Sequence, residues 1–221
     1  MAAKNIKATV ANNAPENTFP EIMKSIPQAD IEAWLSDFTA SVDARKMFEK
    51  KKAKTNANIQ KNLDRYHKNG KKPCFAAFCI AANVPPSFVM GKEREGALYN
   101  VYAMDKLINL GSMLYYGNFP DVNKHMRAVL HNIQVTEQEK VPFTYAMAKA
   151  SVSDKLPLDA KWSVKFRRNN EAEGTGAGQG SPVMRALQTC GIVRVVDEQR
   201  NKAYRANKNP LTAYIAELVA Q

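Results

Sequence analysis

The sequence has no apolar run that approaches the roughly 20 residues needed for a membrane-spanning helix. Its start, MAAKNIKATVANNAPENTFPE, also has no apolar core of the kind found in secretory signal peptides. We therefore expect a cytoplasmic protein with no membrane partner. Hydrophobic residues nevertheless make up 45% of the chain, which is enough to fill a core and excludes a chain that is disordered throughout.

Cysteine is scarce, and Cys74, Cys79 and Cys190 each lie among apolar residues. An odd number of such cysteines in a cytoplasmic protein indicates reduced, buried thiols. The spacing of Cys74 and Cys79 is not that of a zinc knuckle, and His125 and His131 fall on different sides of a helix. The sequence therefore predicts no metal site and no cofactor.

Acidic residues are fewer than lysine and arginine residues, which gives a net charge of +11. The positive charge is concentrated in two blocks. Residues 45–72, here called the lysine block, hold eleven Lys or Arg against two acidic residues, and residues 161–208 hold ten against four. Two basic blocks on a nearly neutral background indicate a polyanionic partner, although a solvated, solubilising surface is the simpler alternative.

The first half of the chain is expected to be helical. Residues 1–27 are polar and contain three prolines, which predicts a mobile arm. Residues 28–135 show helical spacing of apolar residues, and no strong strand pattern appears before residue 190. Asp121 is a plausible N-cap for the helix that follows it. Any homodimer contact is expected in this helical domain. Within its lysine block, the side chains expected to reach phosphates as point charges are Lys50, Lys51, Lys52 and Lys54.

The second half, residues 136–221, shows a helix followed directly by a strand hairpin. Ser181 and Pro182 are suited to the N-cap and first turn of a helix with Val183, Leu187 and Cys190 on its core face. Gly191 can end that helix in the left-handed conformation. The segments IVRVV and KAYRA alternate as strands do, and DEQRN forms the turn between them. The segment 174–180 before this helix is rich in glycine and is expected to be a flexible loop.

This order resembles the winged helix-turn-helix superfamily over roughly residues 138–209, most closely from Ser181 to Asn207. The resemblance implies a mainly α protein with a C-terminal winged helix. It implies that the helix from Ser181 lies in the major groove and that the basic hairpin contacts the backbone or the minor groove. A winged helix that binds another protein is the alternative. The residues that this resemblance assigns to nucleic-acid binding are Arg167, Arg168, Gln179, Ser181, Arg185, Gln188, Arg194, Arg200, Asn201, Lys202 and Arg205.

Enzyme signals are weak. The segments FPD (119–121) and QEK (138–140) are loosely similar to a metal-dependent nuclease centre, but Gln138 stands where such a centre needs a carboxylate. We therefore assign no catalytic residue. The sequence predicts a non-enzymatic, sequence-selective protein that binds double-stranded DNA, either a transcription regulator or a replication initiator. The alternatives are a small Mg-dependent endonuclease and a sequence-independent protein that coats nucleic acid.

Overall fold

Helices form most of this computed structural model, which describes residues 17–221 except 53–56, 95–96 and 198–201. The α-helices are α1 (Phe19–Ser25), α2 (Gln28–Lys50), α3 (Ala57–Gly70), α4 (Pro73–Ala81), α5 (Val101–Tyr115), α6 (Lys124–Gln138), α7 (Tyr145–Val152), α8 (Ala160–Lys165), α9 (Glu173–Thr189) and α10 (Pro210–Ala220). Two short 3-10 helices are η1 (Pro86–Met90) and η2 (Phe119–Asp121). The strands are β1 (Lys92–Arg94), β2 (Ala97–Leu98), β3 (Phe143–Thr144), β4 (Val193–Asp197) and β5 (Ala203–Ala206).

An aromatic cluster holds the first half together. The apolar stripe of α2 places Trp34 and Phe38 inward, where their rings stack with centroids 5.0 Å apart. Phe75 of α4 meets both rings edge-on, and Phe88 of η1 stacks on Phe38. The helical spacing of α2 is therefore confirmed as a core face, and it joins α2 to the helices that follow it.

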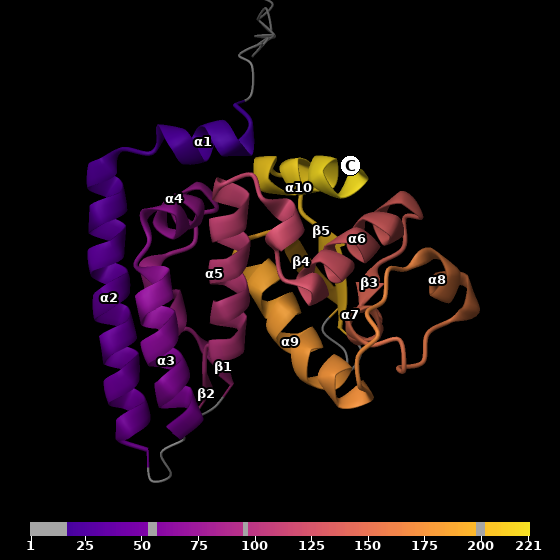
Figure 1. Cartoon of the computed structure of the whole chain (residues 1–221), viewed down its shortest axis with the longest axis horizontal. Coiled ribbons are helices and arrows are strands. Elements are labelled where there is room, and N and C mark those ends of the chain that lie inside the picture. The colour runs from indigo at the N-terminus through magenta and orange to yellow at the C-terminus, as the bar shows by residue number, and fades with distance from the viewer. Residues whose placement is uncertain (1–16, 53–56, 95–96, 198–201) are drawn as a thin grey trace, which may run out of the picture.

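Helix α1 lies where the sequence predicted a mobile arm. Phe19 and Met23 are buried, and Phe19 contacts the rings of Phe78 in α4 and Tyr214 in α10. Figure 1 shows α1 beside α10, so the start of the described chain closes against its end. The arm prediction is wrong for residues 19–25, because a seven-residue helix has too few apolar residues to be recognised without its packing partners. Residues 1–16 lie outside the described part.

The hairpin in the second half forms as the sequence predicts. Gly191 ends α9 with a φ of +70°, and β4 then pairs antiparallel with β5. Strand β3, which the sequence analysis did not expect, adds to the other edge of β5, so the sheet order is β3-β5-β4. Helices α7 and α9 pack against each other, and the predicted core face of Val183, Leu187 and Cys190 is fully buried.

The glycine-rich segment 174–180 is helical, which corrects the expectation of a flexible loop. Helix α9 begins at Glu173, so Ser181 is not its N-cap and Pro182 lies inside the helix. Gly176 and Gly180 face α7, where a Cβ atom on Gly176 would lie 2.4 Å from Leu156 Cδ1 and 3.0 Å from the Lys149 carbonyl oxygen. These glycines allow α7 and α9 to approach closely. The residues next to the glycines in the sequence do not indicate this contact.

Smaller corrections concern the element boundaries. Asn123, and not Asp121, caps α6, since its side chain accepts a hydrogen bond from the His125 backbone N–H. Strands β1, β2 and β3 precede residue 190, where the sequence predicted none. The division into domains at residues 135 and 136 stays a prediction. The proposed boundary falls within α6, and one continuous hydrophobic cluster extends from Phe19 to Ile215.

Candidate nucleic-acid interface

A hollow of about 480 Å³ lies between α9, strand β1 and the β4–β5 hairpin, and we call it the α9 hollow. Four of the residues predicted to bind nucleic acid converge on it, namely Ser181, Arg185, Gln188 and Lys202. Its complete lining is Lys92, Glu93, Tyr145, Ser181, Met184, Arg185, Gln188, Val195, Lys202 and Tyr204.

Helix and strand periodicity explain this convergence. Ser181, Arg185 and Gln188 are four and three residues apart, which places them on one face of α9. In the hairpin, Lys202 lies two residues before Tyr204, and successive even positions on a strand point to the same side. Val195 pairs with Tyr204 in the register and joins that side. The open face of α9 and the inner face of the hairpin therefore meet at the hollow.

Arg185 is held in place by two contacts across the hollow. Its Nε donates to Glu93 Oε1 at 3.0 Å, and its guanidinium lies over the Tyr99 ring, 5.2 Å from the centroid. Glu93 Oε1 also accepts from the Asn100 backbone N–H at 3.0 Å, so the carboxylate itself is fixed. The Arg185 side chain is still 35% exposed. A nucleic acid that bound here would meet a positioned guanidinium that already has one anionic partner.

Tyr99 connects the Arg185 guanidinium, which lies over its ring, to the end of α9. Its hydroxyl lies 2.9 Å from Thr189 Oγ1 at the end of α9, and burial raises the pKa of Tyr99 well above its ordinary value. The hydrogen bond between the two hydroxyls connects Tyr99 to the end of α9. Arg185 lies in the fourth turn of α9, and not one turn into a helix that begins at Ser181, because α9 starts at Glu173.

Two hairpin arginines, Arg194 and Arg205, lie on the opposite side of the sheet from the hollow. Arg194 and Arg205 are directly paired across β4 and β5, one position out of phase with Val195 and Tyr204. Arg205 donates to the Lys140 carbonyl at 2.6 Å and pairs with Glu137 at 3.6 Å, so it ties the hairpin to the end of α6. Arg194 is exposed. Arg200 and Asn201, predicted at the tip of the wing, lie outside the described residues.

Arg167, Arg168 and Gln179 do not line the α9 hollow. The Arg168 guanidinium donates to the backbone carbonyls of Ala150, Ser153, Asp154 and Leu156, and so fixes the loop after α7. Arg167 is exposed on the neighbouring segment, and Gln179 is half-buried on α9. Their predicted contacts with phosphate stay predictions, and Arg168 has an evident structural role.

The lysine block is only partly available to a ligand. Lys50 and Lys51 are exposed at the end of α2, whereas Lys52 pairs with Glu49 at 2.9 Å, and Lys54 lies outside the described residues. Figure 1 shows the end of α2, the β1–β2 hairpin and the start of α9 toward the same edge of the molecule. A single extended polyanion that follows this edge would meet both the lysine block and α9.

Arg45, which opens the lysine block, is buried. Its guanidinium donates to the Val89 and Tyr99 carbonyls at 2.7 and 3.1 Å and pairs with Glu49 at 2.8 Å. Burial lowers the pKa of Arg45, and Glu49 opposes that shift by favouring the charged form. The Arg45–Glu49 spacing of four residues is a sequence signal for this pair, but the spacing does not reveal that the pair is buried.

Sequence reasoning missed Lys92 and Glu93, which complete the α9 hollow. Both stand on β1, and Lys92 is exposed. The only local signal is the charged run KER after Gly91, which is common on any surface. Tertiary folding brings this run beside α9, about 90 residues later in the sequence.

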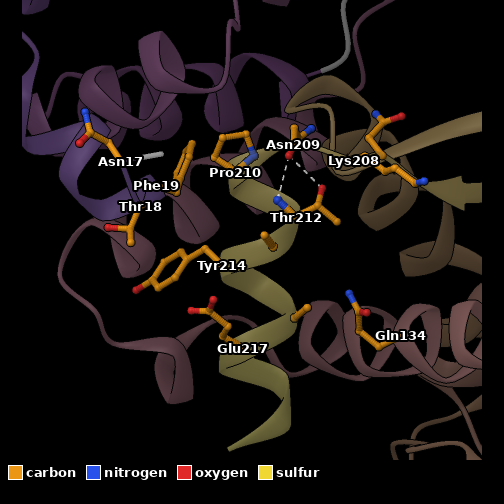
Figure 2. A pocket seen from close by; sticks show the side chains of 13 residues that line it. Asn17, Thr18, Phe19, Gln134, Lys208, Asn209, Pro210, Thr212, Tyr214 and Glu217 are labelled. Atoms are coloured by element: carbon orange, nitrogen blue, oxygen red, sulfur yellow. Dashed lines mark hydrogen bonds between the residues drawn. The ribbon is translucent and has the colours of Figure 1, made fainter. Parts of the chain in front are cut away.

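A further cavity of about 650 Å³ opens between α1, α6 and α10 (Figure 2). Its walls combine polar and apolar side chains. Asn209 Oδ1 accepts from the backbone N–H and the hydroxyl of Thr212 and so caps α10. Lys208 and Glu217 bring charges of both signs to this cavity. None of the residues predicted to bind nucleic acid lines it.

Comparisons with known protein families, with curated proteins and with solved structures find no match for this chain. Within the described residues, no helix is long and apolar enough to cross a membrane. No group of three or more His, Cys, Asp or Glu side chains in that same part is placed to hold a metal ion. The three cysteines are buried and unbridged, as the sequence predicts.

Proposed function

We propose that this protein is a non-enzymatic, sequence-selective protein that binds double-stranded DNA through the α9 hollow. The observation that carries the proposal is the convergence of Arg185, Gln188, Lys92 and Lys202 on one hollow between a helix and a hairpin. Arginine and glutamine are side chains that can read base edges in the major groove, whereas lysines supply positive charge to phosphates.

The order of elements supports a winged helix-turn-helix in this part of the chain. Helix α7 and helix α9 pack together, the β4–β5 hairpin follows α9 directly, and β3 adds a third strand to the same sheet. The short helix α8 is an insertion between the two packed helices. In this interpretation α9 is the recognition helix and the hairpin is the wing.

The exposed face of α9 is suited to close approach by a DNA backbone. Gly174, Ala177, Gly178 and Ser181 are exposed along its first half, and a Cβ atom on Gly174 or Gly178 would meet no described atom within 4 Å. A phosphodiester strand can therefore come near the helix before it reaches Arg185. The Glu93 carboxylate then competes with DNA for the Arg185 guanidinium. This competition favours a DNA sequence that supplies a well-placed hydrogen-bond acceptor.

The proposal is tested by fluorescence anisotropy with a duplex selected from random sequences and with its scrambled counterpart. Arg185→Gln is expected to reduce the preference for the selected duplex by roughly tenfold, because a bidentate arginine contact discriminates by about 1–3 kcal/mol. Lys202→Gln is expected to weaken both complexes equally and to reduce the salt slope by about one. Lys24→Gln removes the same charge from α1 and serves as the control.

Two results would contradict the proposal. One is an affinity that stays flat as salt rises, where about six phosphate contacts predict a roughly thousandfold loss between about 50 and 200 mM. The other is an Arg185→Gln variant that keeps its full preference for the selected duplex.

A second candidate function is sequence-independent coating of nucleic acid, which the exposed Lys50 and Lys51 favour. Coating predicts equal affinity for selected and scrambled duplexes and saturation that scales with length. The same titrations therefore separate the two functions. Added Mg²⁺ with a gel readout tests the endonuclease alternative, which predicts cleavage of the duplex.

A further inference from the structure

A third pocket, of about 490 Å³, lies between α6, the segment 167–169 and the end of α10, and we call it the α6 pocket. It shares no lining residue with the α9 hollow. Lys124, Arg127 and His131 of α6 are three and four residues apart, so they stand on one face of the helix. Arg167 also lines the pocket, from the segment after α8, and the lining contains no Asp or Glu.

Two of these basic groups have no acidic partner among the described residues. Lys124 forms an ion pair with Glu171, but no described carboxylate pairs with the guanidinium of Arg127 or of Arg167. Arg127 Nε donates to the Val122 carbonyl at 3.0 Å, which orients the side chain, and no described residue accepts from its terminal nitrogens. The pocket therefore presents two arginines that an anionic ligand can bind.

Asn132 fixes the opposite wall of the pocket. This side chain is fully buried, and it accepts from the Arg167 backbone N–H at 2.8 Å and donates to the Arg167 carbonyl at 2.7 Å. Its Nδ2 also donates to Ser151 Oγ at 2.8 Å. These contacts set the orientation of the amide, so its Oδ1 accepts from His131 Nδ1 at 3.1 Å. The remaining ring nitrogen of His131, Nε2, is the one left for a ligand.

The size and the walls of the pocket indicate the class of ligand. Inorganic phosphate alone would leave most of the 490 Å³ empty, and the rest of the lining includes Phe119, Pro120, Leu218 and Val219. Binding sites for small molecules combine such apolar walls with a few convergent polar groups. A ligand that fits both parts has a dianionic head and a larger, weakly polar body. Arginine is the residue best suited to a phosphate group, because its fork of donors matches two oxygens at once.

We propose that the α6 pocket binds a phosphomonoester joined to a nucleoside, with Arg127 and Arg167 on the phosphate and the Phe119–Leu218 side against the base. The phosphomonoester belongs either to a free nucleoside monophosphate or to the 5′ end of a nucleic-acid strand. This site does not depend on DNA binding through the α9 hollow, because the two share no lining residue, although Arg167 is also one of the residues that the sequence assigns to nucleic-acid binding.

Isothermal titration calorimetry of the full chain with AMP, CMP, adenosine and inorganic phosphate tests the proposal. We expect saturable binding of a monophosphate and at least tenfold weaker binding of adenosine and of phosphate alone. Arg127→Gln and Arg167→Gln should each weaken nucleotide binding by about tenfold or more, since each removes a charged hydrogen-bond donor. Lys24→Gln, which removes the same charge elsewhere, should bind as the wild type does.

A competition arm identifies the source of the phosphate. An oligonucleotide with a 5′ phosphate that displaces AMP, where its 5′-hydroxyl form does not, assigns the pocket to strand ends. Displacement by neither assigns it to free nucleotides, and both results support the proposal. Absence of AMP and CMP binding, equal binding of AMP and adenosine, or unchanged affinity in both arginine variants would overturn it. Two cross-measurements separate a failure of this proposal from a failure of the proposed function. They are the preference of Arg127→Gln for the selected duplex and the affinity of Arg185→Gln for AMP.

Discussion

Two single alanine substitutions in the glycine-rich part of α9 should have different effects on stability. Gly178 is exposed, and a Cβ atom there would meet no described atom within 4 Å. Alanine is favoured over glycine in a helix by about 1 kcal/mol. Gly178→Ala should therefore stabilise the protein by about that amount and raise Tm by roughly 2–4 °C for a chain of this size.

Gly176 lies two residues earlier but faces α7. A Cβ atom there would lie 2.4 Å from Leu156 Cδ1, 2.9 Å from Ser153 Cβ and 3.0 Å from the Lys149 carbonyl oxygen. The leucine side chain is able to move, whereas the carbonyl and the buried serine cannot do so without shifting α7. Such overpacking costs about 1–3 kcal/mol, against the same gain of about 1 kcal/mol in helix propensity. We therefore expect Gly176→Ala to be between neutral and about 2 kcal/mol less stable than the wild type.

Thermal unfolding followed by far-ultraviolet circular dichroism measures both variants. The expected difference between them is about 1–3 kcal/mol, with Gly178→Ala the more stable. If the segment 174–180 were a loop, both alanines would have similar, small effects. Equal Tm values for the two variants would therefore refute the packing of α9 against α7 described above.

Two further predictions concern stability. Asn132→Ala should lower the free energy of unfolding by about 3 kcal/mol, or Tm by roughly 6–12 °C, because it leaves the Arg167 backbone groups and Ser151 without their buried partner. Thermal unfolding measures this effect, and a change within error would contradict the described hydrogen bonds of Asn132. Burial lowers the pKa of both His67 and His125, so the unfolded chain takes up protons first as pH falls through the ordinary histidine value. Stability should therefore fall between about pH 7.5 and pH 5.5, and a variant with His67→Gln and His125→Gln should show a flatter Tm profile over that interval; equal slopes would contradict the assignment.

The sequence alone was sufficient to predict an element where its local pattern is compatible with only one type of secondary structure. Strict alternation around Tyr204, with Gly191 before it, predicts a strand hairpin after a helix, and the hairpin forms with Gly191 in the left-handed conformation. The apolar stripe that contains Trp34 and Phe38 likewise predicts the buried face of α2. In both cases the conformation is determined by residues within a few positions of one another in the chain.

The candidate site was predictable only in part. Ser181, Arg185, Gln188 and Lys202 were identified from the hairpin and the helix before it, and they do converge on one hollow. Glu93, which holds Arg185, was not identified, because nothing near it in the sequence distinguishes it from an ordinary surface carboxylate. Basic residues that were grouped by their sequence proximity are separated in space: Arg205 braces the hairpin against α6, and Arg168 binds backbone carbonyls.

By itself, the sequence determined the excess of positive charge, the helical character of most of the chain, and the helix, glycine and hairpin order near its end. Only the tertiary structure decided that segment 174–180 is helical and that Arg45 is buried beside Glu49. The reason is the same for both. A helix rich in glycine, like a buried guanidinium, is unfavourable on its own and becomes stable only through partners distant in sequence. For α9 those partners are α7 and α5, and for Arg45 they include the carbonyls of Val89 and Tyr99.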